Sequence, residues 1–287
     1  MSRRPRAATV MSHARIEDTE PTLRRLIEFA RSAGVTLRFD VEETQKHHLR
    51  GSPGLEVNAE ASDDVELCFV LGGDGTILRA LRRYAGTGLP VFAINYGEIG
   101  FLATIDPDGE ETEEALRRAM AGDFEKLTLP AIALDTPHGP QAAINDLAIH
   151  RKVGERVARL AYAPNGEEVG SVRCDGLVVA TPAGSTGYNL ANGGPVMAWG
   201  VEGFVVSFIA PHSLTARALV VAPSDVLDIH NRSEGAVDVV LDGRPVGELG
   251  PGEMIRASFL REAADLCQLP GSSFYRRLRE KFGRLAS

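Results

Sequence analysis

The sequence has few cysteines, and they lie far apart. Cys68, Cys174 and Cys267 are the only three in 287 residues, and no two of them form a Cys-x-x-Cys pair. An odd number at such wide spacing argues against both a disulfide framework and a zinc site. Cys68 lies within an apolar run, which is typical of a small buried residue. We therefore expect a protein of a reducing compartment, the cytoplasm.

The chain also lacks long hydrophobic runs. Residues 204–210 form the longest late apolar stretch, and Ser207 interrupts it. Such a stretch is far too short to span a bilayer. After the basic first six residues, only residues 7–11 are apolar, which is too little for the hydrophobic region of a signal peptide. We expect no membrane segment and no secretion signal.

An excess of positive charge is missing too. Lysine and arginine number 31 against 39 aspartate and glutamate residues, which gives a net charge of −8. Nucleic-acid binding needs clustered Lys and Arg to neutralise phosphates, so the composition argues against it. A phosphorylated small molecule is compatible with this charge, because backbone N–H groups and a few arginines suffice to hold one.

Short apolar runs alternate with helical spacing in the first part of the chain. The predicted strands are residues 8–11, 35–39, 65–71 and 91–95, and the predicted helices are residues 22–33, 77–84 and 110–120. The polar stretch 43–62 is predicted to be a loop or a weak element, with its adjacent histidines, His47 and His48, in solvent. Strands alternating with helices predict an α/β domain with an open, mostly parallel sheet.

From about residue 127 the chain consists of short apolar runs, many of them separated by Gly, Pro, Asn or Asp. No long helical pattern intervenes, which predicts a mostly β domain. The last segment is basic, with Arg276, Arg277 and Arg279 close together, and is predicted to be a helix. We therefore divide the chain into an α/β domain (1–126), a mostly β domain (127–262) and a C-terminal tail (263–287).

The strongest local signal is the loop Gly72-Gly73-Asp74-Gly75-Thr76, which follows a predicted buried strand and leads into a predicted helix. In an open α/β sheet, ligands bind beyond the carboxyl ends of the strands. Glycines there let the backbone approach a phosphate chain, and N–H groups at the helix N-terminus supply positive potential. An Asp in such a site makes sense if it accepts a proton from an attacking hydroxyl or orients a metal. The alternative is a turn in which Asp74 caps the helix.

The loop indicates a kinase but leaves the acceptor open. It matches neither the G-x-x-x-x-G-K-[ST] loop nor the G-x-G-x-x-G fingerprint, so P-loop kinases and Rossmann dehydrogenases are disfavoured. By itself the segment resembles the loops of diacylglycerol and sphingosine kinases, of NAD kinases and, more loosely, of phosphofructokinases.

Other segments resemble the NAD kinase family in particular. Residues 95–102 are similar to its N-x-G-x-[LV]-G-F-L segment, and residues 175–188 are similar to its D-G-[LIV]-[IV]-[VIL]-[SA]-T-P-T-G-S-T-A-Y signature. Residues 192–195 and 211–214 continue the resemblance. Together with Asn145-Asp146, these segments follow the order of the family along most of the chain.

The resemblance implies a set of site residues. It assigns the phosphate donor to Gly72, Gly73, Gly75 and Thr76, and it makes Asp74 the catalytic base. It implies contacts with NAD from Asp74, Gly75, Asn145, Asp146, Arg156, Arg173, Asp175, Thr186, Gly187, Tyr188, Asn189, Ala191 and Arg244. No residue is assigned as a metal ligand.

The chemistry of these side chains agrees with a dinucleotide ligand. The adjacent amide and carboxylate of Asn145 and Asp146 can bind an amide edge or the paired hydroxyls of a ribose. Asp175 can accept hydrogen bonds from a nicotinamide amide or a ribose, and Arg173 can hold a phosphate or pair with Asp175. Arg244 stands where the family has Gln, and its fixed charge either favours phosphate or belongs to an exposed hairpin.

The resemblance implies transfer of the terminal phosphoryl group of ATP, another NTP or polyphosphate to the 2′-hydroxyl of the adenosine ribose of NAD, which gives NADP. It places the active site between the two domains. It also implies a divalent metal, usually Mg²⁺, bound with the donor phosphates, a homodimer or homotetramer, and a tail that packs on the N-terminal domain or on a neighbouring subunit. Two alternatives stay open: a lipid or sphingoid-base kinase with the same loop, and a catalytically silent NAD(P)-binding sensor.

Overall fold

The structure is a computed structural model, and it describes residues 4–60, 64–98, 100–107, 109–136 and 139–283. The chain divides into two compact units, Met1–Thr128 with Ala264–Ser287, and Leu129–Ala263. The first unit is α/β with a mostly parallel sheet, and the second is mostly β, so the predicted fold class is confirmed. Among the described residues, no helix has the length and apolar character needed to cross a membrane.

The first unit is built on a parallel sheet. Its strands are β1 (Ala7–Ser12), β2 (Thr36–Arg38), β3 (Leu55–Glu56), β4 (Leu67–Gly72) and β5 (Pro90–Asn95), and its helices are α1 (Ile16–Ala33), α2 (Val41–Lys46), α3 (Asp74–Arg83), α4 (Gly109–Ala121) and α6 (Phe274–Phe282). The five strands pair in parallel in the order β5-β4-β1-β2-β3. The end of β17 (Met254–Gln268) adds to β5, also in parallel.

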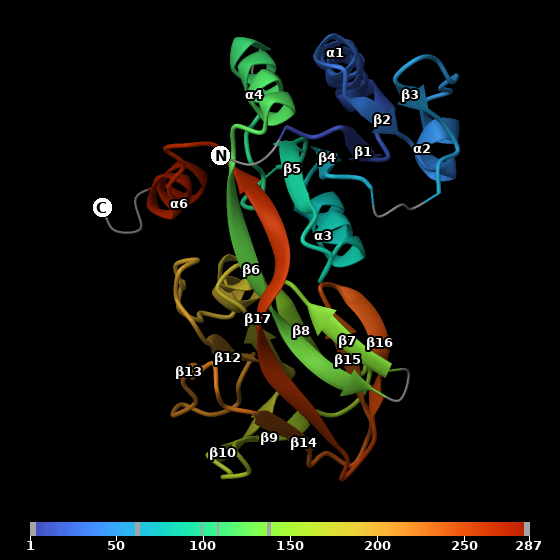
Figure 1. Ribbon diagram of the computed structural model, residues 1–287. Helices are drawn as coiled ribbons and strands as arrows, with labels where there is room; N and C mark the ends of the chain where they lie inside the picture. The colour runs from blue at the N-terminus through green and yellow to red at the C-terminus, as the bar shows by residue number, and fades with distance from the viewer. Residues whose placement is uncertain (1–3, 61–63, 99, 108, 137–138, 284–287) are drawn as a thin grey trace. The chain divides into compact units, whose positions relative to one another are not determined.

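Helices cover both faces of this sheet, as the apolar sequence of β4 predicts. Leu67, Phe69 and Leu71 alternate along the strand and join one hydrophobic core with residues of α1 and α4. Figure 1 shows α1 and α4 on one side of the sheet and α3 on the other. Since β1, β4 and β5 are parallel, the loops that follow them lie at the same edge of the sheet.

Two local predictions differ from the structure. Helix α1 begins at Ile16 rather than at residue 22, and Pro21 lies within it. The prediction of a loop from residue 43 is wrong at its start, because α2 extends to Lys46. The Asp40 side chain caps α2 by accepting a hydrogen bond from Glu43 N at 2.9 Å. A helix this short gives too few apolar positions to show a periodicity.

The second unit consists mostly of antiparallel strands. They are β6 (Glu125–Thr136), β7 (Gly139–Ala143), β8 (Asp146–Arg151), β9 (Ala158–Pro164), β10 (Gly170–Cys174), β11 (Gly176–Ala180), β12 (Phe204–Ile209), β13 (Leu219–Val221), β14 (Leu227–Asn231), β15 (Val237–Leu241), β16 (Arg244–Leu249) and β17. Of these strands, β6 begins and β17 ends in residues of the first unit. One sheet has the order β13-β12-β11-β8-β15-β16, and β10, β9, β14 and β17 pair in another. Residues of both sheets share one hydrophobic core, which includes Leu147, Leu160 and Ile229.

Candidate active site

The glycine loop connects β4 to α3. Gly72 ends the strand, Gly73 is the N-cap residue and Asp74 is the first helical residue. A Cβ atom on Gly73 would lie 3.0 Å from Gly97 Cα, and one on Gly97 would lie 2.8 Å from Gly73 Cα. The loops after β4 and β5 therefore meet backbone to backbone, which leaves no room for a side chain at either position.

Asp74 is held by the loop that follows β5. Its Oδ2 accepts a hydrogen bond from Phe101 N at 3.0 Å, and its Oδ1 accepts one from Leu102 N at 3.0 Å. The carboxylate is thus bound to a neighbouring loop, and the alternative in which Asp74 only caps its own helix is wrong. A carboxylate offers about four acceptor positions. Two backbone donors fix its direction and leave acceptor capacity for a hydroxyl group.

A pocket of 280 Å³ lies beside Gly75 and Thr76. A Cβ atom on Gly75 would meet nothing within 4 Å, so the absent side chain leaves open space. The other lining residues come from the end of β1, the loop after it, α2 and α3, and they are Ser12, His13, Ala14, Glu42, Lys46 and Arg79. Lys46 and Arg79 are cationic, and each pairs with a carboxylate, Lys46 with Glu43 at 2.7 Å and Arg79 with Glu42 at 3.2 Å. With the first amides of α3 beside them, these donors allow the pocket to hold a phosphate.

Lys46 is positioned by a buried carboxylate. Glu43 accepts hydrogen bonds from Ser12 N at 2.9 Å and Ser12 Oγ at 2.6 Å, and Lys46 Nζ lies 2.7 Å from its Oε1. Burial alone would raise the pKa of Glu43, but hydrogen bonds from His47, Lys46 and Ser12 outweigh it and lower the pKa to about 2. The prediction of a solvated histidine pair is wrong for His47, whose side chain is 2% exposed and whose Nε2 lies 2.7 Å from Ser12 Oγ.

In the second unit, Asn145 and Asp146 lie at the start of β8, as predicted. The carboxylate of Asp242 accepts hydrogen bonds from three successive backbone amides, Ile144 N at 3.0 Å, Asn145 N at 2.7 Å and Asp146 N at 3.2 Å. Asp242 and Gly243 both have positive φ, which is typical of a type I′ hairpin turn. The turn between β15 and β16 therefore fixes the backbone of the predicted binding pair.

The side chains of this pair are a buried carboxyl group and a buried amide oxygen. Asp146 is 9% exposed. Its burial and, second, the negative charge of Asp242 raise the pKa of Asp146 to about 7. Asn145 Oδ1 is buried and accepts no hydrogen bond from the described residues. Near neutral pH the pair can therefore both donate and accept hydrogen bonds to a polar ligand.

Tyr188 lies close to two of the predicted acidic residues. Its pKa is raised by burial and, further, by the negative charges of Asp146 and Asp175. The Tyr188 ring stacks on His150, with centroids 5.6 Å apart and planes 24° apart. Sequence reasoning missed His150, because its position within β8 carries no motif. Asp146 and Asp175 thus lie close enough to Tyr188 for their charges to affect its hydroxyl group.

Asp175 pairs with Arg151, whose Nε lies 2.6 Å from Asp175 Oδ1. Arg173, for which pairing with Asp175 was one of two alternatives, stands opposite Arg159 in the pairing of β10 with β9. Arg151 was missed because its position within β8 says nothing about the loop at Asp175. The alternative in which Arg173 pairs with Asp175 is therefore wrong, and the possibility that Arg173 holds a phosphate stays open.

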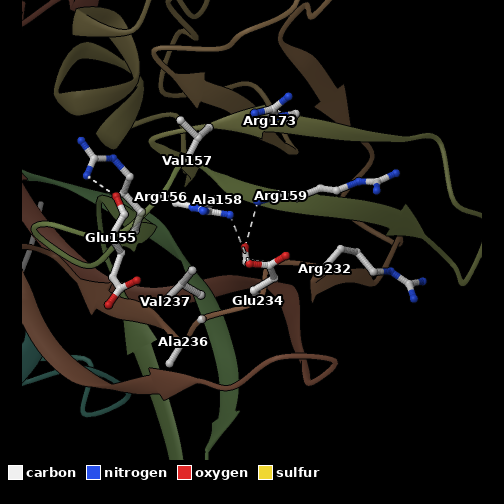
Figure 2. A pocket seen from close by; sticks show the side chains of 13 residues that line it. Glu155, Arg156, Val157, Ala158, Arg159, Arg173, Arg232, Glu234, Ala236 and Val237 are labelled. Atoms are coloured by element: carbon white, nitrogen blue, oxygen red, sulfur yellow. Dashed lines mark hydrogen bonds and ion pairs between the residues drawn. The ribbon is translucent and has the colours of Figure 1, made fainter.

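Arg173 and Arg156 line the same open pocket of 800 Å³ (Figure 2). Arg156 is exposed, and its Nη1 lies 3.7 Å from an oxygen of Glu234. Arg159 and Arg232 also contribute to this pocket. Arg244, the first residue of β16, is exposed and follows the hairpin turn.

The remaining predicted residues lie in a 3₁₀ turn, η1 (Gly184–Thr186), and the short helix α5 (Tyr188–Ala191). Thr186 is half-buried, whereas Gly187 and Ala191 are exposed. Asn189 differs from them, because its side chain is fully buried and donates to Ser185 O at 2.9 Å and to Pro195 O at 3.0 Å. The Asn189 side chain therefore stabilises the segment from inside.

Sequence comparison assigns most of the chain to two domain families. Residues 15–124 match the ATP-NAD kinase N-terminal domain, and residues 144–268 match the ATP-NAD kinase C-terminal domain. The NAD kinase of Gemmatimonas aurantiaca is 34% identical over 227 residues, which cover 76% of this chain and 78% of that protein.

Two solved structures have the same fold. Yeast NADH kinase in complex with NADH has a TM-score of 0.85 at 22% identity, covering 99% of this chain and 89% of its own. An NAD kinase from Archaeoglobus fulgidus in complex with ATP has a TM-score of 0.73 at 25% identity, covering 96% and 97%.

Proposed function

The chain belongs to the ATP-NAD kinase family, and from this premise we propose that it transfers the terminal phosphoryl group of ATP to the 2′-hydroxyl of the adenosine ribose of NAD. The products are NADP and ADP. The observation that carries the proposal is the Asp74 carboxylate, held by two backbone amides within a glycine loop that borders an open pocket. Polyphosphate is the alternative donor.

Asp74 is the proposed base. Its carboxylate accepts the proton of the 2′-hydroxyl while the ribose oxygen forms a bond to the terminal phosphorus of the donor. The bond from that phosphorus to the bridging oxygen breaks, and ADP leaves. In such transfers the protein contributes mainly positioning and charge stabilisation. The fixed direction of the Asp74 carboxylate supports this role, because a base must meet the hydroxyl within hydrogen-bond reach.

The pocket beside Gly75 and Thr76 is the proposed site of the donor phosphates. The open space at Gly75 and the charges of Lys46 and Arg79 support this assignment. A divalent metal, Mg²⁺, is also proposed to bind there with the donor phosphates. Thr76 and Glu42 line the pocket and carry oxygen donors, and Glu42 Oε1 lies 3.2 Å from Arg79 Nη1. When bound, the metal would neutralise charge on the donor phosphates.

The second unit is proposed to bind NAD. Asn145, Asp146, Asp175 and Tyr188 supply amide, carboxyl and hydroxyl groups for the ribose, and the Tyr188 ring supplies a face for stacking. The further proposed contacts are the half-buried Thr186, the exposed Gly187 and Ala191, and the arginines Arg156, Arg173 and Arg244. We also propose that the enzyme is cytoplasmic and forms a homodimer or homotetramer.

The direct test is NADP formation from NAD, with ATP and polyphosphate as alternative donors. We expect turnover with ATP in the presence of Mg²⁺, and none with diacylglycerol as the acceptor. Binding of NAD without turnover on either donor would contradict the proposal and favour the silent sensor.

The role of Asp74 is tested by Asp74→Asn. We expect turnover to fall by about 10²- to 10⁴-fold, the usual contribution of a general base, while the Kd for NAD changes little. Turnover is followed by coupled detection of NADP, and the Kd by calorimetry. The control is Asp123→Asn, which removes a carboxylate that pairs with Arg118 in the same unit. Near-normal NADP formation by Asp74→Asn would refute the role.

A further inference from the structure

The C-terminal helix α6 reaches the loop that holds Asp74. We infer that Arg277, on this helix, is a positioning residue for the reaction, because it fixes the peptide group through which the protein aims the Asp74 carboxylate. The inference rests on the proposed role of Asp74 as the base.

Arg277 binds the carbonyl groups of the loop after β5. Its Nη1 donates to Phe101 O at 2.8 Å and also to Ala103 O, and its Nη2 lies 3.3 Å from Gln268 Oε1. Burial lowers the pKa of Arg277, while the negative charges of Asp106, Asp74 and Glu280 raise it. A guanidinium stays charged in proteins, so a half-buried positive charge faces this loop.

One peptide group connects Arg277 to Asp74. The carbonyl of Phe101 accepts from Arg277, and the N–H of the same peptide, on Leu102, donates to Asp74 Oδ1. Hydrogen bonds in such a chain polarise one another, so the cation strengthens the donor that faces the carboxylate. The second amide on Asp74, Phe101 N, flanks the same carbonyl. Both bonds that aim the proposed base therefore depend on a segment that Arg277 holds.

Other contacts keep α6 against this segment. The Phe101 ring lies 5.8 Å from the rings of Phe274 and Phe282, centroid to centroid. Lys281 Nζ lies 2.9 Å and 2.8 Å from the two oxygens of Asp106. These contacts secure the helix at several points, so loss of the Arg277 side chain alone removes the hydrogen bonds to the carbonyls and leaves other anchors in place.

The consequence is a specific kinetic signature. If Arg277 fixes the orientation of the Asp74 carboxylate, loss of Arg277 leaves that orientation less well defined and lowers kcat. Binding of NAD in the second unit should change little. A misplacement of about 1 Å at a reacting group can cost about 10²-fold in rate. A purely structural role would instead lower the melting temperature or the amount of active enzyme, with kcat per folded molecule unchanged.

The test compares Arg277→Ala and Arg277→Lys with Arg279→Ala, an exposed position on the same helix. We expect Arg277→Ala to lower kcat by about 10- to 100-fold, with KM for NAD within about twofold of wild type. Arg277→Lys should recover part of kcat, since an ammonium group can still donate to a carbonyl. Arg279→Ala should match wild type. If Arg277→Ala does not fold, the kcat of Arg277→Lys decides, and a value equal to wild type would overturn the inference.

A double variant separates this inference from the proposed function. In the Asp74→Asn background, Arg277→Ala should lower the residual turnover by less than about twofold, because the two residues act as one unit. A full additive loss would overturn the inference. High activity of Asp74→Asn would refute the base itself. Loss of activity in Asp74→Asn with normal kcat in folded Arg277→Ala would leave the base intact and reject only the role of Arg277.

Discussion

Asp146→Asn gives the most informative test of the second unit. Asp146 is 9% exposed, and burial together with the charge of Asp242 raises its pKa from the ordinary 3.8 to about 7. The pKa of Asp146 in the folded chain is thus about three units above its ordinary value, and each unit corresponds to about 1.4 kcal/mol. Ionised Asp146 therefore lowers the free energy of unfolding by at most about 4 kcal/mol. The amide has nearly the same shape and no charge.

Proton binding by Asp146 sets the direction in which the stability of the protein changes with pH. Between about pH 4 and about pH 7 the folded chain keeps the Asp146 proton while the unfolded chain has lost it. The favourable contribution of protonated Asp146 is therefore complete below about pH 4 and is lost as the pH rises through about 7, with a slope of about −1.4 kcal/mol per pH unit. Asp146→Asn lacks this slope, so it should be more stable than wild type at pH 8, with an advantage that shrinks toward pH 4.

The assay is urea unfolding of both proteins at half-unit steps of pH, with the free energy of unfolding taken by linear extrapolation. Asp238→Asn, on the neighbouring strand β15, controls for the loss of one negative charge. A difference between wild type and Asp146→Asn that stays constant from about pH 4 to about pH 8 would show that Asp146 ionises as it does in water, and would refute the reasoning.

Two further predictions concern the first unit. Gly73→Ala would bring a Cβ atom to 3.0 Å from Gly97 Cα, so it should lower both the melting temperature and kcat. The Cβ atom of Gly75→Ala would meet no atom within 4 Å. This variant should therefore keep the melting temperature of wild type but raise KM for ATP. Calorimetry and steady-state kinetics check the pair, and equal effects of the two changes would contradict the geometry. Glu43→Gln removes a buried carboxylate whose pKa is lowered from 4.5 to about 2, so it should cost about 3 kcal/mol at pH 7. The stabilisation by ionised Glu43 is present above about pH 4.5 and is lost as the pH falls through about 2. Urea unfolding should therefore show a smaller loss of unfolding free energy in Glu43→Gln at pH 3 than at pH 7. An equal loss at the two pH values would contradict the prediction.

The fold class was predictable because its signals are local and repeated. The apolar run before the glycine loop belongs to β4, which helices cover on both faces, and residues 91–95 lie in β5. The short runs after residue 127 likewise became antiparallel strands. The helix α2 could not be predicted, because six residues show no period and its Asp40 cap is recognisable only once the helix is known.

Residues of the candidate site could be proposed from the sequence only where they belong to a motif. The glycine loop and the pair Asn145-Asp146 were found from the sequence, since residue type and order are enough to suggest phosphate and ribose chemistry. The pairing of Asp175 with Arg151, and the stack of His150 on Tyr188, were not found. Those contacts depend on which strands become neighbours, and strand pairing brings together residues that are distant in the chain.

What the sequence by itself determined is the type of reaction: the glycines around Asp74 specify a backbone that can approach phosphates, and the segments downstream specify the NAD kinase family. What only the tertiary structure decided is how Asp74 is held. Its two donors, Phe101 and Leu102, follow the next strand of the sheet, and Arg277 reaches their loop from the far end of the chain. Hydrogen bonds act over about 3 Å, so a residue 203 positions away joins the site only when the chain has folded.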